Sequence, residues 1–444
     1  MRAPGAILAV VVLLFVAAFF AWKIFHPGPM AFAGGSTVAL ADYHAADPTG
    51  VPADLKNADV VRRGEYLARA ADCFACHTVS RDRLFAGGLA LPLPFGTLYS
   101  TNITPDKDTG IGNYSDQDFL NAVQRGIRRD GARLYPAMPF PSYTQMTDAD
   151  ALAIKAYLFS LPPVRAVSLP NTLSFPYDQR WLMTFWSAFF NENARFAPNT
   201  AQSPEWNRGA YIAEALAHCG ECHTPRNFAL ALDNRNKFSG AVYGWYAFNI
   251  TSDKGSGIGA WSDDELRGYL SAGHAYGRGT AAGPMGEAVD QSFSYMAPFD
   301  IRALITYVRS VPPLVSADLP ANRAPPASPS HKEGPTTNIV GKRVFEGACV
   351  HCHDWTGVSE ISPFATIAGT RGVNDRTATN VVQIVLSGSK RHTPDGAISM
   401  PAFGSQYSDT EIAAVANYVT ARFGAEQSKV TDKDVAELRR QTAD

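Results

Sequence analysis

The chain contains little cysteine: six residues among 444, all confined to three short stretches. These stretches are DCFACHTVS from residue 72, HCGECHTPR from residue 218 and ACVHCHDWT from residue 348. A disulfide framework would distribute its cysteines more widely over the fold, so this confinement argues against one. In each stretch two residues separate the cysteines, and a histidine follows the second cysteine directly.

An excess of charge of either sign is also lacking. The 39 Lys and Arg residues nearly balance the 41 Asp and Glu residues, which gives a net charge of −2. This balance offers no basic surface, so we expect no nucleic acid as a partner. No phosphate-binding loop, nucleophile–base pair or carboxylate dyad is recognisable, and we therefore predict no substrate-oxidising site in this chain.

Long apolar runs are absent except for one, from Gly5 to Trp22. As a helix this run would span about 27 Å, close to the ~30 Å hydrocarbon core of a bilayer. Arg2 precedes it, so the remaining chain is expected outside the cytoplasm. The alternative is a cleaved signal peptide ending at Ala31-Phe32-Ala33. We expect a retained transmembrane helix in a bacterial inner membrane, and both alternatives place most of the protein in the periplasm.

The sequence repeats itself. The first match, with one extra residue in the second copy, is between RGEYLARAADCFACHT from residue 63 and RGAYIAEALAHCGECHT from residue 208. The second match is between NITPDKDTGIGNYSDQDF from residue 102 and NITSDKGSGIGAWSDDEL from residue 249. A third, shorter stretch shares the start, GKRVFEGACVHCH, and the end, YSDTEIAAVANYVTARFG. Repetition at this length predicts three copies of one small domain.

Each repeat is predicted to be mainly helical, with one helix running into the cysteine pair. Further helices are expected to begin at Ser115 or Ser262, and final helices at Thr147 or Ser408, because serine and threonine cap helix N-termini. The predicted organisation is an anchor at 1–28, unit 1 at 50–165, an aromatic-rich bridge at 166–200, unit 2 at 201–315, a Pro-rich linker at 316–336, unit 3 at 337–425 and a charged tail at 426–444.

Cys-x-x-Cys-His is the attachment signature of a c-type haem. At the end of a helix these positions share one face, so two thiols can bond the porphyrin vinyl groups while the imidazole faces the iron. A zinc site would need two cysteine pairs close together, and a thioredoxin-type motif would need a βαβ context. We therefore predict three covalently bound haem c groups, held by Cys73 and Cys76, Cys219 and Cys222, and Cys349 and Cys352, with His77, His223 and His353 as iron ligands.

The sixth iron ligand is predicted to be methionine, which favours electron transfer and raises the reduction potential. Met146 and Met296 align with each other and with Tyr407, which cannot replace a thioether, so both are predicted to be core residues. The predicted ligands each precede the final helix of a unit: Met138 in LYPAMPF, Met285 in AAGPMGEAV and Met400 in AISMPAF.

Several other polar residues invite a role beside the haems. His274 and His392 lie nearer the methionines and are alternative iron ligands. Pro363 resembles the proline whose carbonyl holds the axial histidine in small cytochromes. Asn102 and Asn249 recur at matched positions, either to bond haem propionates or to shape a turn.

The bridge concentrates aromatic residues in FPYDQRWLMTFWSAFFNENARF, residues 175–196. Such a stretch fits a partner subunit, a membrane interface or the border of a quinone site. The alternative is that it packs across the first two haem units. We leave these four interpretations open at this point.

Three such units behind a membrane signal resemble the cytochrome c subunit of the membrane-bound, quinone-linked dehydrogenases of acetic acid bacteria. The resemblance runs from about Val60 to Gly424. The stretches that are most similar to that family are GGLALPLPFGTLYSTNITPDKDTGIG, GIRRDGARLYPAMPFPSY and HCGECHTPR. The resemblance implies mainly α architecture, with three cytochrome c-type haem domains in tandem. It also implies that a large subunit oxidises the substrate and that its electrons pass through three haems to ubiquinone.

The resemblance favours the aldehyde dehydrogenase type, whose partners are a molybdopterin subunit and a small iron–sulfur subunit. The alcohol type carries a cleaved signal and a long Trp-rich extension, whereas this C-terminus is short and charged. An alcohol dehydrogenase or a flavin-linked gluconate or sugar dehydrogenase is the alternative partner. A function of another class is a tethered shuttle that delivers electrons to a terminal oxidase without binding quinone.

Overall fold

The computed structural model describes residues 13, 17, 27–80, 82–321, 337–393 and 396–441. Within these ranges the fold is mainly helical, as predicted, and its strands form only two-stranded antiparallel hairpins. No helix in the described ranges is long and apolar enough to cross a membrane. The predicted anchor at 1–28 lies almost wholly outside them.

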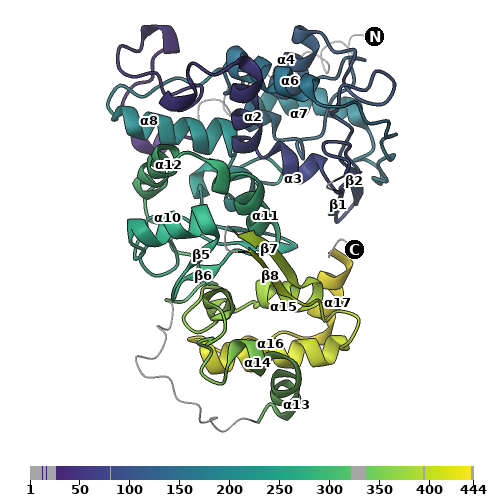
Figure 1. Ribbon diagram of the computed structural model, residues 1–444, viewed down its shortest axis with the longest axis vertical. Coiled ribbons are helices and arrows are strands. Elements are labelled where there is room, and N and C mark those ends of the chain that lie inside the picture. The colour runs from purple at the N-terminus through teal and green to yellow at the C-terminus, as the bar shows by residue number, and fades with distance from the viewer. Residues whose placement is uncertain are drawn as a thin grey trace, which may run out of the picture.

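Units 1 and 2 share the order helix, cysteine motif, hairpin, helix and final helix, and they occupy the upper two thirds of Figure 1. Unit 1 comprises α2 (Val60–Ala70), α3 (Cys73–His77), β1 (Ala90–Leu93), β2 (Gly96–Tyr99), α4 (Asp116–Arg125), α5 (Phe140–Tyr143) and α6 (Asp148–Ser160). Unit 2 comprises α8 (Pro204–Tyr211), α9 (Gly220–His223), β3 (Ala241–Tyr243), β4 (Trp245–Ala247), α10 (Asp263–Ala272), β5 (His274–Ala275), β6 (Gly279–Thr280), α11 (Gly283–Gln291) and α12 (Pro298–Ser310).

Unit 3 lies at the lower end of the molecule in Figure 1. It comprises α13 (Ile339–Val344), α14 (Val350–His353), α15 (Thr379–Ser387), β7 (Ser389–Thr393), β8 (Gly396–Met400) and α16 (Asp409–Phe423). The predicted charged tail then forms a helix, α17 (Asp432–Gln441). It is more than a surface segment, because Val430 and Val435 are buried in a hydrophobic cluster with α15 and α16.

The predicted helix starts are confirmed. Ser115, Ser262 and Ser408 each accept a hydrogen bond from the third residue of the helix that follows, and a carboxylate returns the bond in a capping box. Thr147 caps α6 in the same way, through the backbone N–H of Asp150. These local contacts satisfy helix N–H groups that would otherwise have no partner.

The first and last helices of each unit cross at a glycine–alanine contact. At Gly64 and Gly209 a methyl group would lie 1.9 Å from the carbonyl oxygens of Ala153 and Ala303, respectively. At Gly341 the corresponding distance to the carbonyl oxygen of Ala414 is 2.2 Å. No Cβ atom fits at such distances, so glycine is what permits these crossings of α2 with α6, α8 with α12 and α13 with α16.

The stretch before the cysteine pair differs among the units. In unit 2, which has one residue more than unit 1, Ile212–Leu216 form a turn of π-helix between α8 and the cysteines. The matching stretch of unit 1 stays within α2. Unit 3 also forms a π turn at this place, Phe345–Cys349.

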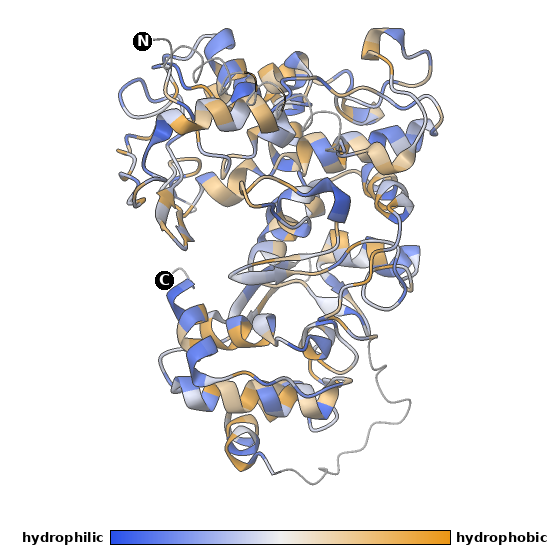
Figure 2. Cartoon of the chain, turned by 180° about the vertical axis from the view of Figure 1, so that it is seen from behind, coloured by the Kyte–Doolittle hydropathy of each residue, from blue (hydrophilic) through white to orange (hydrophobic). Residues whose placement is uncertain are grey.

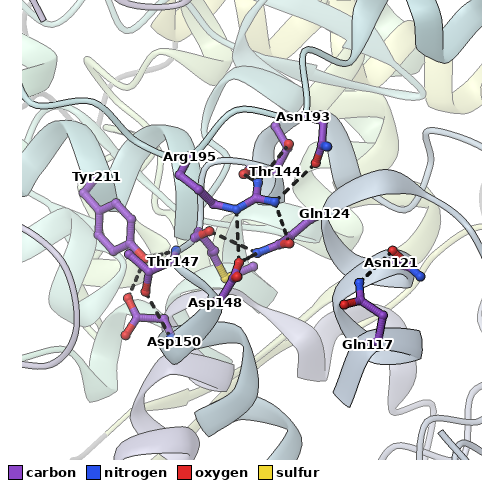
Figure 3. A network of polar contacts seen from close by, with 11 residues as sticks. Gln117, Asn121, Gln124, Thr144, Thr147, Asp148, Asp150, Asn193, Arg195 and Tyr211 are labelled. Atoms are coloured by element: carbon purple, nitrogen blue, oxygen red, sulfur yellow. Dashed lines mark hydrogen bonds and ion pairs between the residues drawn. The ribbon is translucent and has the colours of Figure 1, made fainter. Parts of the chain in front are cut away.

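Units 1 and 2 share one continuous hydrophobic core, whereas unit 3 has two clusters of its own. The contacts across the first pair are reciprocal. Tyr66 of unit 1 donates a hydrogen bond to Asp300 of unit 2. The aligned Tyr211 of unit 2 donates to Asp150 of unit 1, and this second contact is drawn in Figure 3. Such reciprocity is what two copies related by an approximate two-fold axis produce.

The bridge crosses this pair and forms a short helix, α7 (Met183–Phe190). Arg195 fastens its end to unit 1: its guanidinium donates to Gln124 Oε1 at 2.7 Å and to Asp148 Oδ1 at 3.2 Å (Figure 3). In the hydropathy view, the helices carry both apolar and polar residues (Figure 2). Trp186 is partly covered, whereas Trp181 and Phe185 are exposed, so only part of the aromatic stretch packs across the units.

Candidate haem c sites

The structure places each cysteine pair and its histidine on a short helical segment. Cys73, Cys76 and His77 lie on α3, which follows α2 after a bend at Asp72, a residue in the left-handed conformation. The two motifs of units 2 and 3 end in α9 and α14. None of the six cysteines forms a disulfide. Each pair is therefore available to form thioether bonds, as the motif predicts.

The thiols of units 1 and 2 are weak acids in their surroundings. Burial, followed by the charge of Asp72, raises the pKa of Cys73 and Cys76 to about 12. Burial likewise raises the pKa of Cys219 to about 12 and that of Cys222 to about 11. These four thiols are therefore protonated at neutral pH, unlike reactive cysteines, whose pKa is lowered.

All three histidines are oriented by a backbone carbonyl. The Nδ1 atom of His77 lies 2.7 Å from the carbonyl oxygen of Thr101. The equivalent contacts are His223 to Phe248 at 2.6 Å and His353 to Ala365 at 2.6 Å. Since a carbonyl only accepts, Nδ1 carries the proton in each case and Nε2 is the nitrogen available to a metal.

Burial also keeps these imidazoles neutral. Desolvation lowers the pKa of His77, His223 and His353, and the hydrogen bond to the carbonyl opposes it only in part. A neutral imidazole with its Nδ1 proton fixed is the form that binds iron. The histidine is therefore neutral, with its Nδ1 proton bonded to a backbone carbonyl, in all three units.

In unit 3 the carbonyl that accepts from the histidine differs from the predicted one. Pro363 was predicted to hold the axial histidine, but the carbonyl of Ala365 does so, at the end of a 3₁₀ turn that Pro363 begins. In units 1 and 2 the acceptors are Thr101 and Phe248, which sequence reasoning did not identify. Their position in the sequence could have identified them, because each directly precedes the repeated Asn-Ile-Thr.

The asparagines of that repeat shape a loop. Asn102 accepts from the backbone N–H of Thr104 at 2.9 Å and donates to the carbonyl of Val164 at 2.8 Å. Asn249 accepts from Thr251 at 2.8 Å and donates to the carbonyl of Leu314 at 2.6 Å. Of the two roles predicted, the structure supports the turn rather than the propionate contact. Each asparagine holds the loop that carries the histidine's acceptor.

The predicted iron-binding methionines lie in three different local structures. Met138 precedes α5, Met285 lies in the first turn of α11, and Met400 ends β8. All three are partly buried and pack against the hydrophobic clusters. Met146 and Met296, in contrast, are buried members of the core shared by units 1 and 2, as predicted. The assignment of the three ligands itself stays a prediction.

The alternative histidine ligands have other surroundings. His274 Nδ1 lies 3.0 Å from Thr280 Oγ1, and its ring packs against Phe364 in a tilted arrangement with centroids 5.0 Å apart. Its Nε2 is buried and has no hydrogen-bond partner among the described residues, so a polar group of a bound ligand would fit there. His392 is exposed on β7. Free thiols, oriented histidines and this orphaned nitrogen together fit covalently bound haem c.

The motifs of units 1 and 2 lie against each other. Tyr143 donates to the carbonyl of Ala71 at 2.5 Å, and its ring packs on His218 with centroids 5.4 Å apart. Ser142 donates to Glu221 at 2.9 Å. These contacts join α5 of unit 1 to residues just before each cysteine pair and, through Glu221, to a residue between the two cysteines of the second pair. The first two sites are therefore neighbours across the shared core.

Unit 3 meets unit 2 beside its own histidine loop. Thr280 Oγ1 of β6 donates to the carbonyl of Phe364 at 3.0 Å, one residue before the carbonyl that holds His353. Asn380 of α15 pairs with Tyr246 of β4, accepting from its N–H at 2.7 Å and donating to its carbonyl at 2.9 Å. Unit 2 thus contacts both other units close to their histidine sites.

Comparison with known proteins agrees with this chemistry. Residues 61–162 match the family model "Cytochrome c", and residues 338–419 match "Cytochrome C oxidase, cbb3-type, subunit III". These are the parts that contain the first and third motifs. Together they identify cytochrome c domains, which carry covalently bound haem.

Relatives extend the similarity to nearly the whole chain. The fructose dehydrogenase cytochrome subunit of Gluconobacter japonicus is 39% identical, covering 89% of this chain and 85% of the relative. The gluconate 2-dehydrogenase cytochrome c subunit of Pantoea cypripedii is 37% identical, covering 87% and 91%. The cytochrome c subunit of the quinone alcohol dehydrogenase of Gluconacetobacter polyoxogenes is 34% identical, covering 86% and 84%. The chain belongs to the family of cytochrome c subunits of quinone-linked dehydrogenases.

Proposed function

We propose that this chain carries three haem c groups with His/Met ligation and relays electrons from a dehydrogenase subunit to ubiquinone. The observation that carries the proposal is the same histidine arrangement in three units, each beside two free thiols. Bound haem would supply one-electron iron chemistry, which no side chain provides. The protein's part is to attach, orient and bury it.

Each set of residues would have its own role in binding the haem. The cysteine thiols would form the covalent bonds, and His77, His223 and His353 would present Nε2 to iron. Met138, Met285 and Met400 would complete the ligation and raise the reduction potentials. The buried positions of the histidines would limit water access, which also raises the potential.

The contacts between units support a relay. Units 1 and 2 meet at their motifs through Tyr143 and Ser142, and unit 2 touches unit 3 beside Phe364. We propose that electrons pass between neighbouring sites in this spatial order, with unit 2 in the middle. The direction of flow depends on where the dehydrogenase and the quinone bind.

A membrane location is also part of the proposal. Trp181, Phe185 and Phe228 have 60%, 51% and 93% of their surface exposed. Trp186 donates to the carbonyl of Ala229 at 2.8 Å, which holds the Phe228 loop beside α7. Exposed aromatic residues gathered in one place are typical of membrane interfaces.

The apolar N-terminal run supports the same orientation. The carbonyl of Pro27 accepts a hydrogen bond from Asn234 at 3.1 Å, so the described chain begins next to the loop that also holds Phe228. We propose that the run from Gly5 to Trp22 anchors the protein in the inner membrane. The aromatic residues would then face the periplasmic surface of the same bilayer.

The partner dehydrogenase is proposed from the relatives. The aldehyde type, with molybdopterin and iron–sulfur subunits, is the expectation from the sequence. Two relatives that cover most of this chain serve fructose and gluconate dehydrogenases, which favours a sugar or sugar-acid oxidising partner. The experiment is to purify the native complex in mild detergent and add fructose, gluconate, ethanol and acetaldehyde separately. The substrate that promptly reduces the haems identifies the partner.

The shuttle to a terminal oxidase is the alternative from another class. It would share the haem sites but would not reduce quinone. If the complex reduces a soluble cytochrome or oxidase but no ubiquinone analogue, the shuttle is correct and the quinone relay is wrong. If no substrate reduces the haems in the purified complex, the dehydrogenase partnership fails.

A further inference from the structure

A buried ion pair joins unit 3 to unit 2. Arg391 lies in β7 of unit 3, with 4% of its side chain exposed, and Asp290 lies in α11 of unit 2, with 12% exposed. Arg391 Nη2 lies 2.7 Å from Asp290 Oδ1, and Nε lies 3.0 Å from both carboxylate oxygens. The backbone N–H of His392 adds a bond to Oδ2 at 3.1 Å.

The same guanidinium also holds the other end of α11. Arg391 Nη1 donates to the carbonyl of Ala281 at 2.8 Å, just before the helix begins. One side chain from unit 3 therefore contacts the start and the last turn of this helix. The space for it is made by Gly273, where a Cβ would lie 2.2 Å from Nη2, and by Gly286, where it would lie 3.2 Å from Cδ.

One element joined by this pair carries a predicted iron ligand, and the other pairs with a strand that carries one. α11 contains Met285, the predicted ligand of the second haem. β7 pairs with β8 in antiparallel register, Ser389 opposite Met400 and Arg391 opposite Ile398. Met400, the predicted ligand of the third haem, thus ends the strand that pairs with the one carrying Arg391.

The chemistry of this ion pair suits it to hold β7 and α11 in one arrangement. The guanidinium is planar and always charged, and it makes several parallel hydrogen bonds that lysine cannot reproduce. Because both groups are buried, loss of one partner would leave the other charge without compensation, and the two elements would separate or rearrange. A buried pair of this kind is better suited to fixing one arrangement than to adding stability.

We propose that Arg391 and Asp290 are positioning residues that fix together the two elements from which Met285 and Met400 would reach iron, so that the second and third haems would be tuned as a pair. This inference rests on the proposed His/Met ligation. Neither residue is a proposed iron ligand: Asp290 would act through α11, which carries Met285, and Arg391 through β7, which pairs with the strand that ends in Met400. Disturbing the pair is expected to weaken both Met–iron bonds and to lower both reduction potentials, leaving the first haem unchanged.

The test uses the full chain with its haems, in the native complex. The variants are Arg391→Gln and the nearly isosteric Asp290→Asn, with Arg391→Lys as the conservative replacement. The readouts are the reduction potential of each haem, from a spectroscopic redox titration, and the intensity of the Met-to-iron charge-transfer band. We expect two potentials to fall and the band to lose the contribution of two haems, with Arg391→Lys intermediate.

The exposed pair between Arg376 and Glu426 provides a matched control in unit 3, since its 2.8 Å contact is also Arg–carboxylate. Glu426→Gln should leave all three potentials unchanged. Met285→Leu and Met400→Leu assign each potential to its haem. If Asp290→Asn keeps all potentials, or shifts that of one haem only, the inference is wrong. If Met285→Leu itself leaves the spectrum unchanged, the ligand assignment has failed instead.

Discussion

The hydroxyl of Tyr66 donates a hydrogen bond of 2.6 Å to the carboxylate of Asp300, a residue of the second repeat with no exposed surface. The same carboxylate pairs with Arg208 at 2.6 Å. The aligned Tyr211 makes the mirror contact with Asp150. The two repeats are therefore held by exchanged bonds in one core, and this exchange brings their cysteine motifs together.

Removing either hydroxyl should weaken this interface. Tyr66→Phe leaves a buried carboxylate with one donor fewer, and we expect a loss of about 1–3 kcal/mol in unfolding free energy. Tyr211→Phe should produce a similar loss, since its contact is equivalent. Chemical denaturation followed by far-UV circular dichroism measures both. Tyr177→Phe, on the exposed bridge, is the control, and equal stability of all three variants would contradict the exchanged interface.

The helix crossings predict a steep penalty for a single methyl group. In Gly209→Ala the new Cβ would overlap the carbonyl of Ala303, so we expect α8 and α12 to separate at a cost of about 3 kcal/mol. Gly372→Ala is the control, because nothing lies within 4 Å of that Cβ position and the backbone is helical. A thermal melt distinguishes the two. Similar melting temperatures for Gly209→Ala and the parent would mean that the crossing is looser than described.

The ligand assignment makes a sharp distinction between two methionines of unit 1. Met138→Leu should remove the Met-ligated signature of the first haem and lower its potential, because leucine cannot bind iron. Met146→Leu should retain both and cost less than about 1.5 kcal/mol, since it is a volume-conserving change in the core. Absorption spectroscopy and redox titration of both variants distinguish the proposed iron ligand from the core residue. A retained signature in Met138→Leu would show that another residue binds this iron.

The proposed membrane face predicts where lipid contacts the protein. A phospholipid with a photoreactive group near its headgroup should label peptides that contain residues 181–185 and 228–230 in the native membrane. A peptide containing Ile361 is the control, because that side chain is exposed but lies in unit 3. Trp181→Ser with Phe185→Ser should reduce the labelling. Equal labelling of the control peptide would contradict a membrane-facing patch.

Local signals allowed much of this arrangement to be predicted. Ser115, Ser262 and Ser408 identified helix starts because capping is a contact between residues three apart. The spacing of cysteine and histidine identified the attachment helices for the same reason. Alignment of the repeats separated Met146 and Met296, which are core residues, from Met138 and Met285.

What the sequence did not predict depends on long-range contacts or on the backbone. The carbonyls of Thr101, Phe248 and Ala365 hold the histidines. Because every residue type has a backbone carbonyl, the identity of the residue does not reveal this role. The fusion of units 1 and 2 around one core joins residues far apart in the chain, such as Tyr66 and Asp300. The helical tail was missed because its apolar contacts rest on few residues, chiefly Val435.

The central claim is tested most directly by one titration of the native complex. After substrate has reduced the haems, a ubiquinone analogue is added and the haem absorption is followed, with haem content measured per chain. Our account predicts three covalent haems per chain and their prompt reoxidation by the quinone. Fewer haems, or haems that stay reduced until a soluble acceptor is supplied, would contradict it.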